Sequence, residues 1–82
     1  MMMKVTVLAF GIARELTGTS QTELDLPEGA TAAAVRAALE ARYEQLKKLS
    51  TYALAVNSMY AQPDTGVKDG DEIAIIPPVS GG

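Results

Sequence analysis

The chain of 82 residues contains no cysteine and no histidine. Without cysteine there can be no disulfide bond, thiolate metal site, cysteine nucleophile or cysteine-bound iron–sulfur cluster. Without histidine the chain lacks the most common metal ligand and the usual general base near neutral pH. Its serines, which are Ser20, Ser50, Ser58 and Ser80, therefore have no imidazole to activate them. We expect no bound metal and no side-chain active site within this chain.

Positive charge and long apolar runs are also scarce. Seven Lys and Arg residues stand against ten Asp and Glu residues, which gives a net charge of -3. No basic stripe is present, so we expect no nucleic-acid partner. No apolar run is long enough to cross a bilayer, and Met1–Val5 lacks the charged and apolar regions of a signal peptide. We therefore expect a cytoplasmic location and no membrane partner.

The sequence does contain a series of short alternating and helical segments. Its composition, 48% hydrophobic and 21% charged, is typical of one small globular domain over residues 1–82. Period-two alternation predicts strands, and runs of strong helix formers predict helices. The expected elements are a strand over Met3–Phe10, a helical turn over Gly11–Gly18, a strand over Gln21–Leu26, a long helix from Ala32 to about Lys48 with Thr31 as N-cap, and strands over Thr51–Val56, Met59–Tyr60 and Glu72–Ile76.

This order of elements predicts an α+β fold of the β-grasp, or ubiquitin-like, type. Apolar residues recur along the long helix at helical spacing, so the helix must cover one face of a sheet. In a β-grasp roll the helix packs on one face of a mixed sheet of about four to five strands. The first and last strands then lie side by side. A ferredoxin-like split βαβ fold would need a second long helix, which the pattern does not provide.

The face of the sheet without a helix is expected to carry an apolar patch. If Val5 and Val7 point toward the helix, then Leu8 and Phe10 point away from it. The same alternation points Ile76 away, and Tyr60 lies on the short edge strand. An exposed group of this kind marks a partner surface. The alternative is that residues 11–16 fold over the group and form a small second core.

The last six residues, 77–82, are expected to form a flexible tail. Pro77 and Pro78 hold the backbone extended, so the tail leaves the sheet as an arm. Residues 79–82 would then reach roughly 13 to 14 Å beyond it. Gly81 and Gly82 have no side chains, so the terminal carboxylate could enter a narrow slot in a partner enzyme. An ionised carboxylate is a poor acyl donor, so we expect Gly82 to react after adenylation; the alternative is a frayed terminus with no role.

Several motifs, taken together, resemble a known family over essentially the whole chain. They are Lys4-Val5, Arg14-Glu15-Leu16, Leu26-Pro27, Ala55-Val56-Asn57 and the block Asp69-Gly70-Asp71-Glu72-Ile73-Ala74-Ile75-Ile76-Pro77-Pro78-Val79-Ser80-Gly81-Gly82. The chain resembles the small, sulfur-carrying subunits of molybdopterin synthase. The final block is the most specific of these motifs, and Arg-Glu-Leu alone would be weak.

The resemblance implies a mechanism and a set of partners. A ubiquitin-activating-like enzyme would use ATP and magnesium to adenylate Gly82, and a sulfur donor would convert the adenylate to a thiocarboxylate. Residues Val79, Ser80, Gly81 and Gly82 would then insert into the large synthase subunit, in a heterotetramer, and build the dithiolene of molybdopterin. The contact with that subunit would fall on Tyr60 and Ile76, on Leu8 or Phe10, and on Pro77 and Pro78. No tightly bound cofactor is implied.

Three alternatives to this function remain open. The first is a sister sulfur carrier for thiamine thiazole synthesis or tRNA thiolation. The second is a protein modifier that is joined to lysines through Gly82. The third is a β-grasp adaptor whose tail is inert, so that deletion of Gly81 and Gly82 would change no phenotype.

Overall fold

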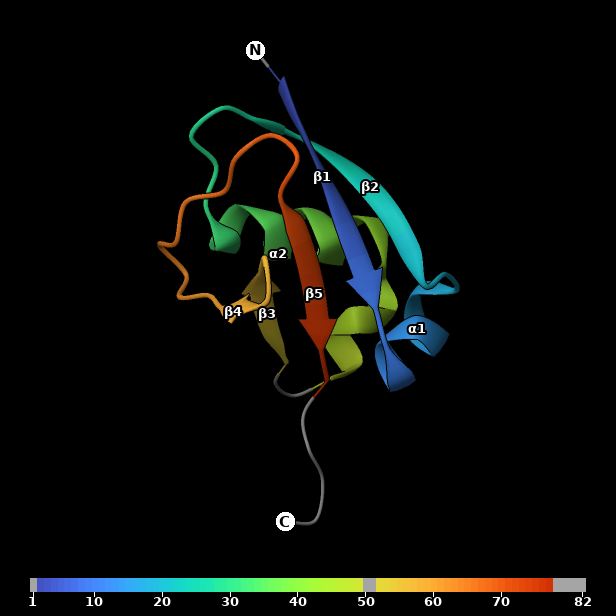
Figure 1. Cartoon of the computed structure of the whole chain (residues 1–82). Helices are drawn as coiled ribbons and strands as arrows, with labels where there is room; N and C mark the ends of the chain where they lie inside the picture. The colour runs from blue at the N-terminus through green and yellow to red at the C-terminus, as the bar shows by residue number, and fades with distance from the viewer. Residues whose placement is uncertain (1, 50–51, 78–82) are drawn as a thin grey trace.

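The computed structural model describes residues 2–49 and 52–77 (Figure 1). In these residues the elements, in chain order, are β1 (Met2–Ala9), α1 (Gly11–Thr17), β2 (Gln21–Pro27), α2 (Ala32–Arg42), the 3-10 helix η1 (Glu44–Lys48), β3 (Ala53–Val56), β4 (Met59–Tyr60) and β5 (Glu72–Ile76). No helix among the described residues has the length and apolar character needed to span a membrane.

The five strands form one mixed sheet in the order β2-β1-β5-β3-β4. β1 pairs antiparallel with β2 and parallel with β5, so the first and last strands are neighbours as predicted. β3 pairs antiparallel with both β5 and β4. α2 crosses behind the sheet in Figure 1, and no helix within residues 2–49 and 52–77 covers the opposite face. This arrangement is the predicted β-grasp fold.

The core fills the space between α2 and the sheet. Its fully buried large side chains are Val5, Val7, Val35, Leu39, Leu46, Ile73 and Ile75. Burying each such aliphatic side chain contributes about 1.5–3 kcal/mol. Because alternate residues of β1 and β5 enter this core, the residues between them are fixed on the opposite face.

The long helix ends earlier than the sequence predicts. α2 stops at Arg42, where Tyr43 adopts φ −125° and ψ 83°, and η1 continues the chain to Lys48. This change of direction brings Leu46 into full burial at the end of the core. No glycine or proline in the sequence marks the end of the helix at this point, so packing overrides the helix propensity of this segment.

The ends of both α-helices are held mainly by backbone contacts. Gly18 closes α1 at φ 76°, and its N–H donates to the carbonyl of Arg14 at 2.9 Å, as the sequence predicts. Thr31 is the N-cap of α2, but its side chain makes no capping hydrogen bond. Instead, the N–H groups of Ala32 and Ala33 donate to backbone carbonyls in the loop over residues 63–65. The loop therefore satisfies the free donors of this helix end.

The β3–β4 turn contains backbone strain that a single substitution should relieve. Asn57 and Ser58 both have positive φ, 50° and 73°, as a two-residue hairpin turn of type I′ requires. The Asn57 side chain already bonds Asp71 and the backbone of Glu72, so it holds the turn in place. We expect Ser58→Gly to raise the free energy of unfolding by about 0.5–1 kcal/mol, because glycine tolerates positive φ.

Urea denaturation checks this expectation, with Ser20→Gly as the matched control. Ser20 lies outside the residues with positive φ, so its replacement by glycine should lower stability. Equal losses of stability in the two variants would show that the turn is not strained.

A polar network ties α2 to the residue that precedes β3. The guanidinium of Arg36 lies 4.3 Å from the centre of the Tyr52 ring and donates to the Tyr52 carbonyl at 2.9 Å. The Tyr52 hydroxyl donates to Glu40 Oε2 at 2.6 Å. Burial, followed by the hydrogen bond to Glu40 and its charge, raises the pKa of Tyr52 above the usual value, although Arg36 opposes this effect. The neutral phenol is therefore the form that the fold favours.

This network predicts a loss of stability at high pH. A pKa that is raised on folding contributes stability that is fully present below the unfolded value, about 10, and is lost as the pH rises through the folded value. We expect Tyr52→Phe to cost about 1–2 kcal/mol near neutral pH. It should also make the decline in stability above pH ~10 shallower. Urea denaturation at several pH values tests both effects, and an unchanged alkaline decline would contradict this role for Tyr52.

Candidate functional site

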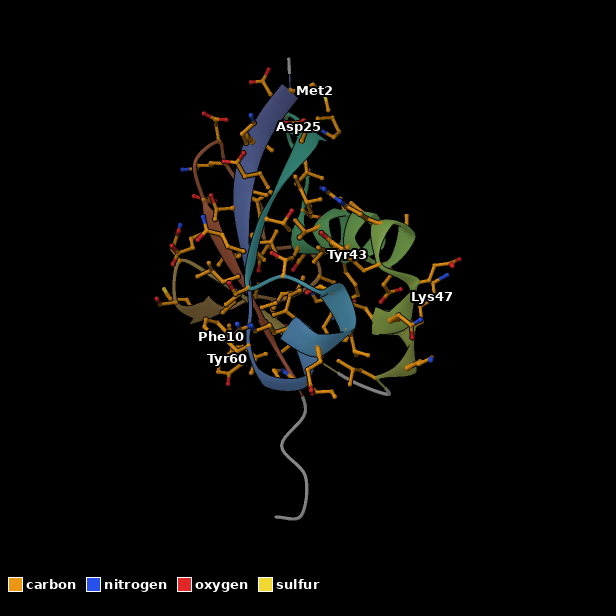
Figure 2. The ribbon with its side chains drawn as sticks, turned by 90° about the vertical axis from the view of Figure 1, so that its right-hand side faces the viewer. Met2, Phe10, Asp25, Tyr43, Lys47 and Tyr60 are labelled. Carbon is orange, nitrogen blue, oxygen red and sulfur yellow. The ribbon has the colours of Figure 1, made fainter. Side chains whose placement is uncertain are left out.

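The candidate site lies on the face of the sheet that α2 leaves uncovered. Figure 2 views the molecule from the side, with Tyr43 on the helical side and Phe10 and Tyr60 on the opposite side. Phe10 and Tyr60 lie toward one end of this face, and Met2 and Asp25 lie toward the other end. The two ends differ in chemistry, as the register of the strands shows.

An apolar row crosses four strands near one end of the open face. Leu8 is opposite Ala74, Ala74 is opposite Ala55, and Ala55 is opposite Tyr60. Residues opposite each other in neighbouring strands point to the same face, so these four side chains lie on one line. On β2 the row is continued by Gln21, which is polar but uncharged. It forms the central strip of the candidate partner surface.

A second apolar row lies next to the first, where β5 ends. Ile76 is opposite Ala53, and Phe10 follows β1 two residues beyond Leu8. Phe10 and Tyr60 are 53% and 72% exposed, whereas Leu8 and Ile76 are half-buried. We call Leu8, Phe10, Tyr60 and Ile76, with the three alanines between them, the apolar patch.

Pro77 extends this patch toward the tail. It directly follows Ile76, and its ring carbon Cγ would lie 3.8 Å from a Cβ added to Gly11. Gly11 itself has φ 55°, a conformation that other residues adopt with strain. The start of α1 therefore lies close to Pro77, the first residue of the tail.

The other end of the open face is charged. Glu23, Thr6 and Glu72 form one row across β2, β1 and β5, and Lys4 lies beside Asp25. The Lys4 ammonium is 3.9 Å from a Glu23 carboxylate oxygen, with both side chains well exposed. A pair of this kind contributes little to stability, about 0–1 kcal/mol. The face is therefore divided into an apolar half and a charged half.

The helix α1 does not cover the apolar patch. Ala13 is fully buried and Leu16 packs against the main core, so α1 closes the end of that core. Phe10 and Tyr60 remain exposed. The alternative, in which residues 11–16 fold over the patch and form a small second core, is therefore wrong, because α1 contacts η1 and β1 instead.

The structure brings together five of the predicted interface residues and leaves the others outside its description. Leu8, Phe10, Tyr60, Ile76 and Pro77 all lie at one end of the open face. Pro78 and the predicted insertion residues Val79, Ser80, Gly81 and Gly82 lie outside the described residues. Leu8 and Phe10 both lie on the open face, so both side chains could contact a partner protein there.

The sequence analysis missed the small residues at the centre of the patch. Ala53, Ala55 and Ala74 lie between the larger side chains and keep the surface flat. The sequence does contain a signal for these alanines, because they alternate with Leu54 and Ile75, whose side chains enter the core. The described residues contain no group of three or more acidic, histidine or cysteine residues that could hold a metal ion. With exposed aromatic rings around small apolar residues, the patch is suited to binding a partner.

Comparison with known proteins identifies the family of the chain. The model of the ThiS family matches residues 7–82. A molybdopterin synthase sulfur carrier subunit from Chlamydomonas reinhardtii is 37% identical, over 98% of this chain and 100% of that protein. A protein of the same description from Arabidopsis thaliana is 39% identical, over 96% of this chain and 83% of that protein.

Solved structures agree with the sequence relatives. A complex of subunits 1 and 2 of the molybdopterin-converting factor from Helicobacter pylori contains a chain that is 32% identical, with a TM-score of 0.68. The match covers 98% of this chain and 100% of that chain. A ubiquitin from Caldiarchaeum subterraneum is 28% identical, with a TM-score of 0.68 and full coverage of both chains. The chain therefore belongs to the ThiS family, and its relatives there include the sulfur carrier subunits of molybdopterin synthase.

Proposed function

We propose that this chain is the sulfur carrier subunit of a molybdopterin synthase. The observation that carries the proposal is its match, at 37–39% identity over nearly its full length, to sulfur carrier subunits of that enzyme. The exposed apolar patch at the base of the tail supports it, since a carrier must dock on each protein that handles its terminus. The complex of two subunits from Helicobacter pylori supports a large subunit as one of these partners.

In the proposed chemistry the reacting group is the carboxylate of Gly82. A ubiquitin-activating-like enzyme adenylates it, using ATP and magnesium, and pyrophosphate leaves. A sulfur donor then displaces AMP, which leaves a thiocarboxylate at Gly82. On the large subunit that sulfur attacks the cyclic pyranopterin precursor and forms a carbon–sulfur bond, and water then hydrolyses the resulting thioester at Gly82, which returns the carboxylate and leaves the sulfur on the precursor. Two such deliveries complete the dithiolene, and acid–base side chains are supplied by the partners.

The apolar patch has a docking role in this scheme. Binding at Leu8, Phe10, Tyr60 and Ile76 would hold the domain while residues 79–82 reach into the partner, over roughly 13 to 14 Å when fully extended. Pro77 and Pro78 limit the directions of the tail, because proline fixes φ. A partner that holds the patch would therefore also orient the terminus, and the conformational entropy lost on insertion is reduced.

Reconstitution with defined partners tests the proposal against the sister sulfur carriers. The thiocarboxylated chain is incubated either with a large synthase subunit and the pyranopterin precursor, or with a thiazole synthase and its substrates. Formation of molybdopterin in the first mixture alone is the expected result. Turnover only with the thiazole synthase would overturn the choice of pathway and keep the carrier chemistry.

The likeness to a ubiquitin from Caldiarchaeum subterraneum makes a protein modifier the second candidate. A modifier would use the same adenylated Gly82 but would join it to lysine side chains. Cell extracts would then contain conjugates of higher mass, and these would disappear when Gly82 is deleted. Their absence, in cells that make molybdopterin with this chain, is expected for a dedicated sulfur carrier.

A further inference from the structure

The outer edge of β2 has backbone groups that could pair with another strand. The N–H of Ala9 donates to the carbonyl of Ser20, which continues the register that places Leu8 opposite Gln21. In an antiparallel pair, hydrogen-bonded and non-hydrogen-bonded residues alternate. The backbones of residues 20, 22, 24 and 26 therefore face β1, and those of residues 21, 23, 25 and 27 face outward.

Three of these four outward positions are occupied or blocked. The Thr19 hydroxyl donates to the Gln21 carbonyl at 2.8 Å and accepts from the Gln21 N–H at 3.3 Å. Arg42 Nη1, at the end of α2, donates to the Glu23 carbonyl at 3.0 Å. Pro27 has no N–H to donate. Among the described residues, the outward N–H and carbonyl of Asp25 have no hydrogen-bond partner.

We propose that the β2 edge is a latent pairing surface for a second copy of this chain, and that Arg42 and Thr19 keep it closed. Exposed edge strands join other edges unless side chains or charges block them. Arg42 takes the carbonyl at the middle of the edge, so a second β2 strand could not bond there without displacing it. In a two-fold pairing centred on Leu24, Glu23 of each copy would lie opposite Asp25 of the other, and these like charges weaken the pair further.

The occupant is a second copy because the outward groups that remain for pairing, those of Glu23 and Asp25, lie symmetrically about Leu24, with the blocked positions Gln21 and Pro27 on either side. An antiparallel β2–β2 contact would use the same backbone groups on both chains and would extend the sheet from five to ten strands. The outward groups of Glu23 and Asp25 would supply its hydrogen bonds. The apolar patch, on β1, β3, β4 and β5, would remain free for partners.

Sedimentation of Arg42→Ala tests the proposal, in high salt to screen the facing carboxylates. We expect it to self-associate at least ten-fold more strongly than the parent chain. Arg14→Ala removes an exposed arginine from α1, away from this edge, and should remain monomeric. Arg42 also lies 5.6 Å from the centre of the Tyr43 ring, so Tyr43→Leu controls for loss of that stacking and should remain monomeric too.

Two further measurements locate the contact. Adding Asp25→Pro to Arg42→Ala removes an outward N–H without breaking a hydrogen bond to β1, and it should restore the monomer even though it also removes one carboxylate from this edge. In Arg42→Ala alone, the amides of Glu23 and Asp25 should become protected from hydrogen exchange as the protein concentration rises. A folded Arg42→Ala chain that stays monomeric would overturn the proposal. So would an assembly in which these two amides still exchange freely.

Discussion

Deletion of Gly82 should abolish sulfur transfer and leave the stability of the domain almost unchanged. The described core ends with Ile75, Pro77 is the last described residue, and residue 82 follows it by five positions in the sequence. Glycine has no side chain to pack, so we expect its removal to change the free energy of unfolding by no more than about 0.5 kcal/mol. The terminal carboxylate would move to Gly81 and would fall about one residue, ~3.5 Å, short of the reacting position.

Two assays separate the chemical from the structural effect of this deletion. Thermal unfolding measures the domain, and molybdopterin formation with a large subunit measures the transfer. Lys47→Ala, an exposed change on η1 at the helical side, should retain both. A marked fall in the thermal midpoint after deletion of Gly82 would show that the tail is part of the fold. Normal transfer without Gly82 would refute its role as the sulfur carrier.

A glutamate at position 60 should weaken the complex with the large subunit, whereas a glutamate at position 59 should not. Met59 and Tyr60 are neighbours in β4 and are almost equally exposed, at 74% and 72%. Tyr60 is opposite Ala55 on the open face, and Met59 is opposite Val56 on the helical face. Met59→Glu and Tyr60→Glu therefore place the same charge on the same strand at nearly the same exposure, but on opposite faces of the sheet.

Tyr60→Glu should cause a large loss of affinity for the large subunit, because an unpaired charge would be buried in an apolar contact. Such a charge lowers the binding free energy by about 3 kcal/mol or more, so the dissociation constant should rise by a factor of roughly a hundred or more. Ile76→Glu should act in the same direction on the neighbouring strand. Calorimetric titration of the large subunit measures each variant. Equal effects of Met59→Glu and Tyr60→Glu would show that the apolar patch is not the docking surface.

The alternation of β1 shows how much of the site could be read from the sequence. Val5 and Val7 enter the core as predicted, and this fixes Leu8 and Phe10 on the other face before any tertiary contact is known. The same holds for Ile73 and Ile75, and hence for Ile76. The pairing of β1 with β5 then follows from the β-grasp topology. Local periodicity together with one fold assignment was therefore enough to predict the four large side chains of the patch, but not the alanines between them.

The features that the sequence did not predict depend on contacts between distant segments. The end of α2 at Arg42 has no local signal, since Glu44–Lys48 are ordinary helix residues. The hydrogen bond from Arg42 to β2 exists only because this helix end lies beside the sheet edge. The contact between Tyr52 and Glu40 likewise joins residues twelve positions apart. Propensity and spacing contain no information on such encounters.

An intact mass spectrum tests the central claim most directly. The chain is incubated with ATP, magnesium, an adenylating enzyme of the ubiquitin-activating type and a sulfur source, and the tail is then fragmented to locate any change. The account predicts a mass gain equal to the replacement of one oxygen by one sulfur, located at Gly82. An unmodified mass would contradict it, if the same enzyme preparation thiocarboxylates another carrier in parallel.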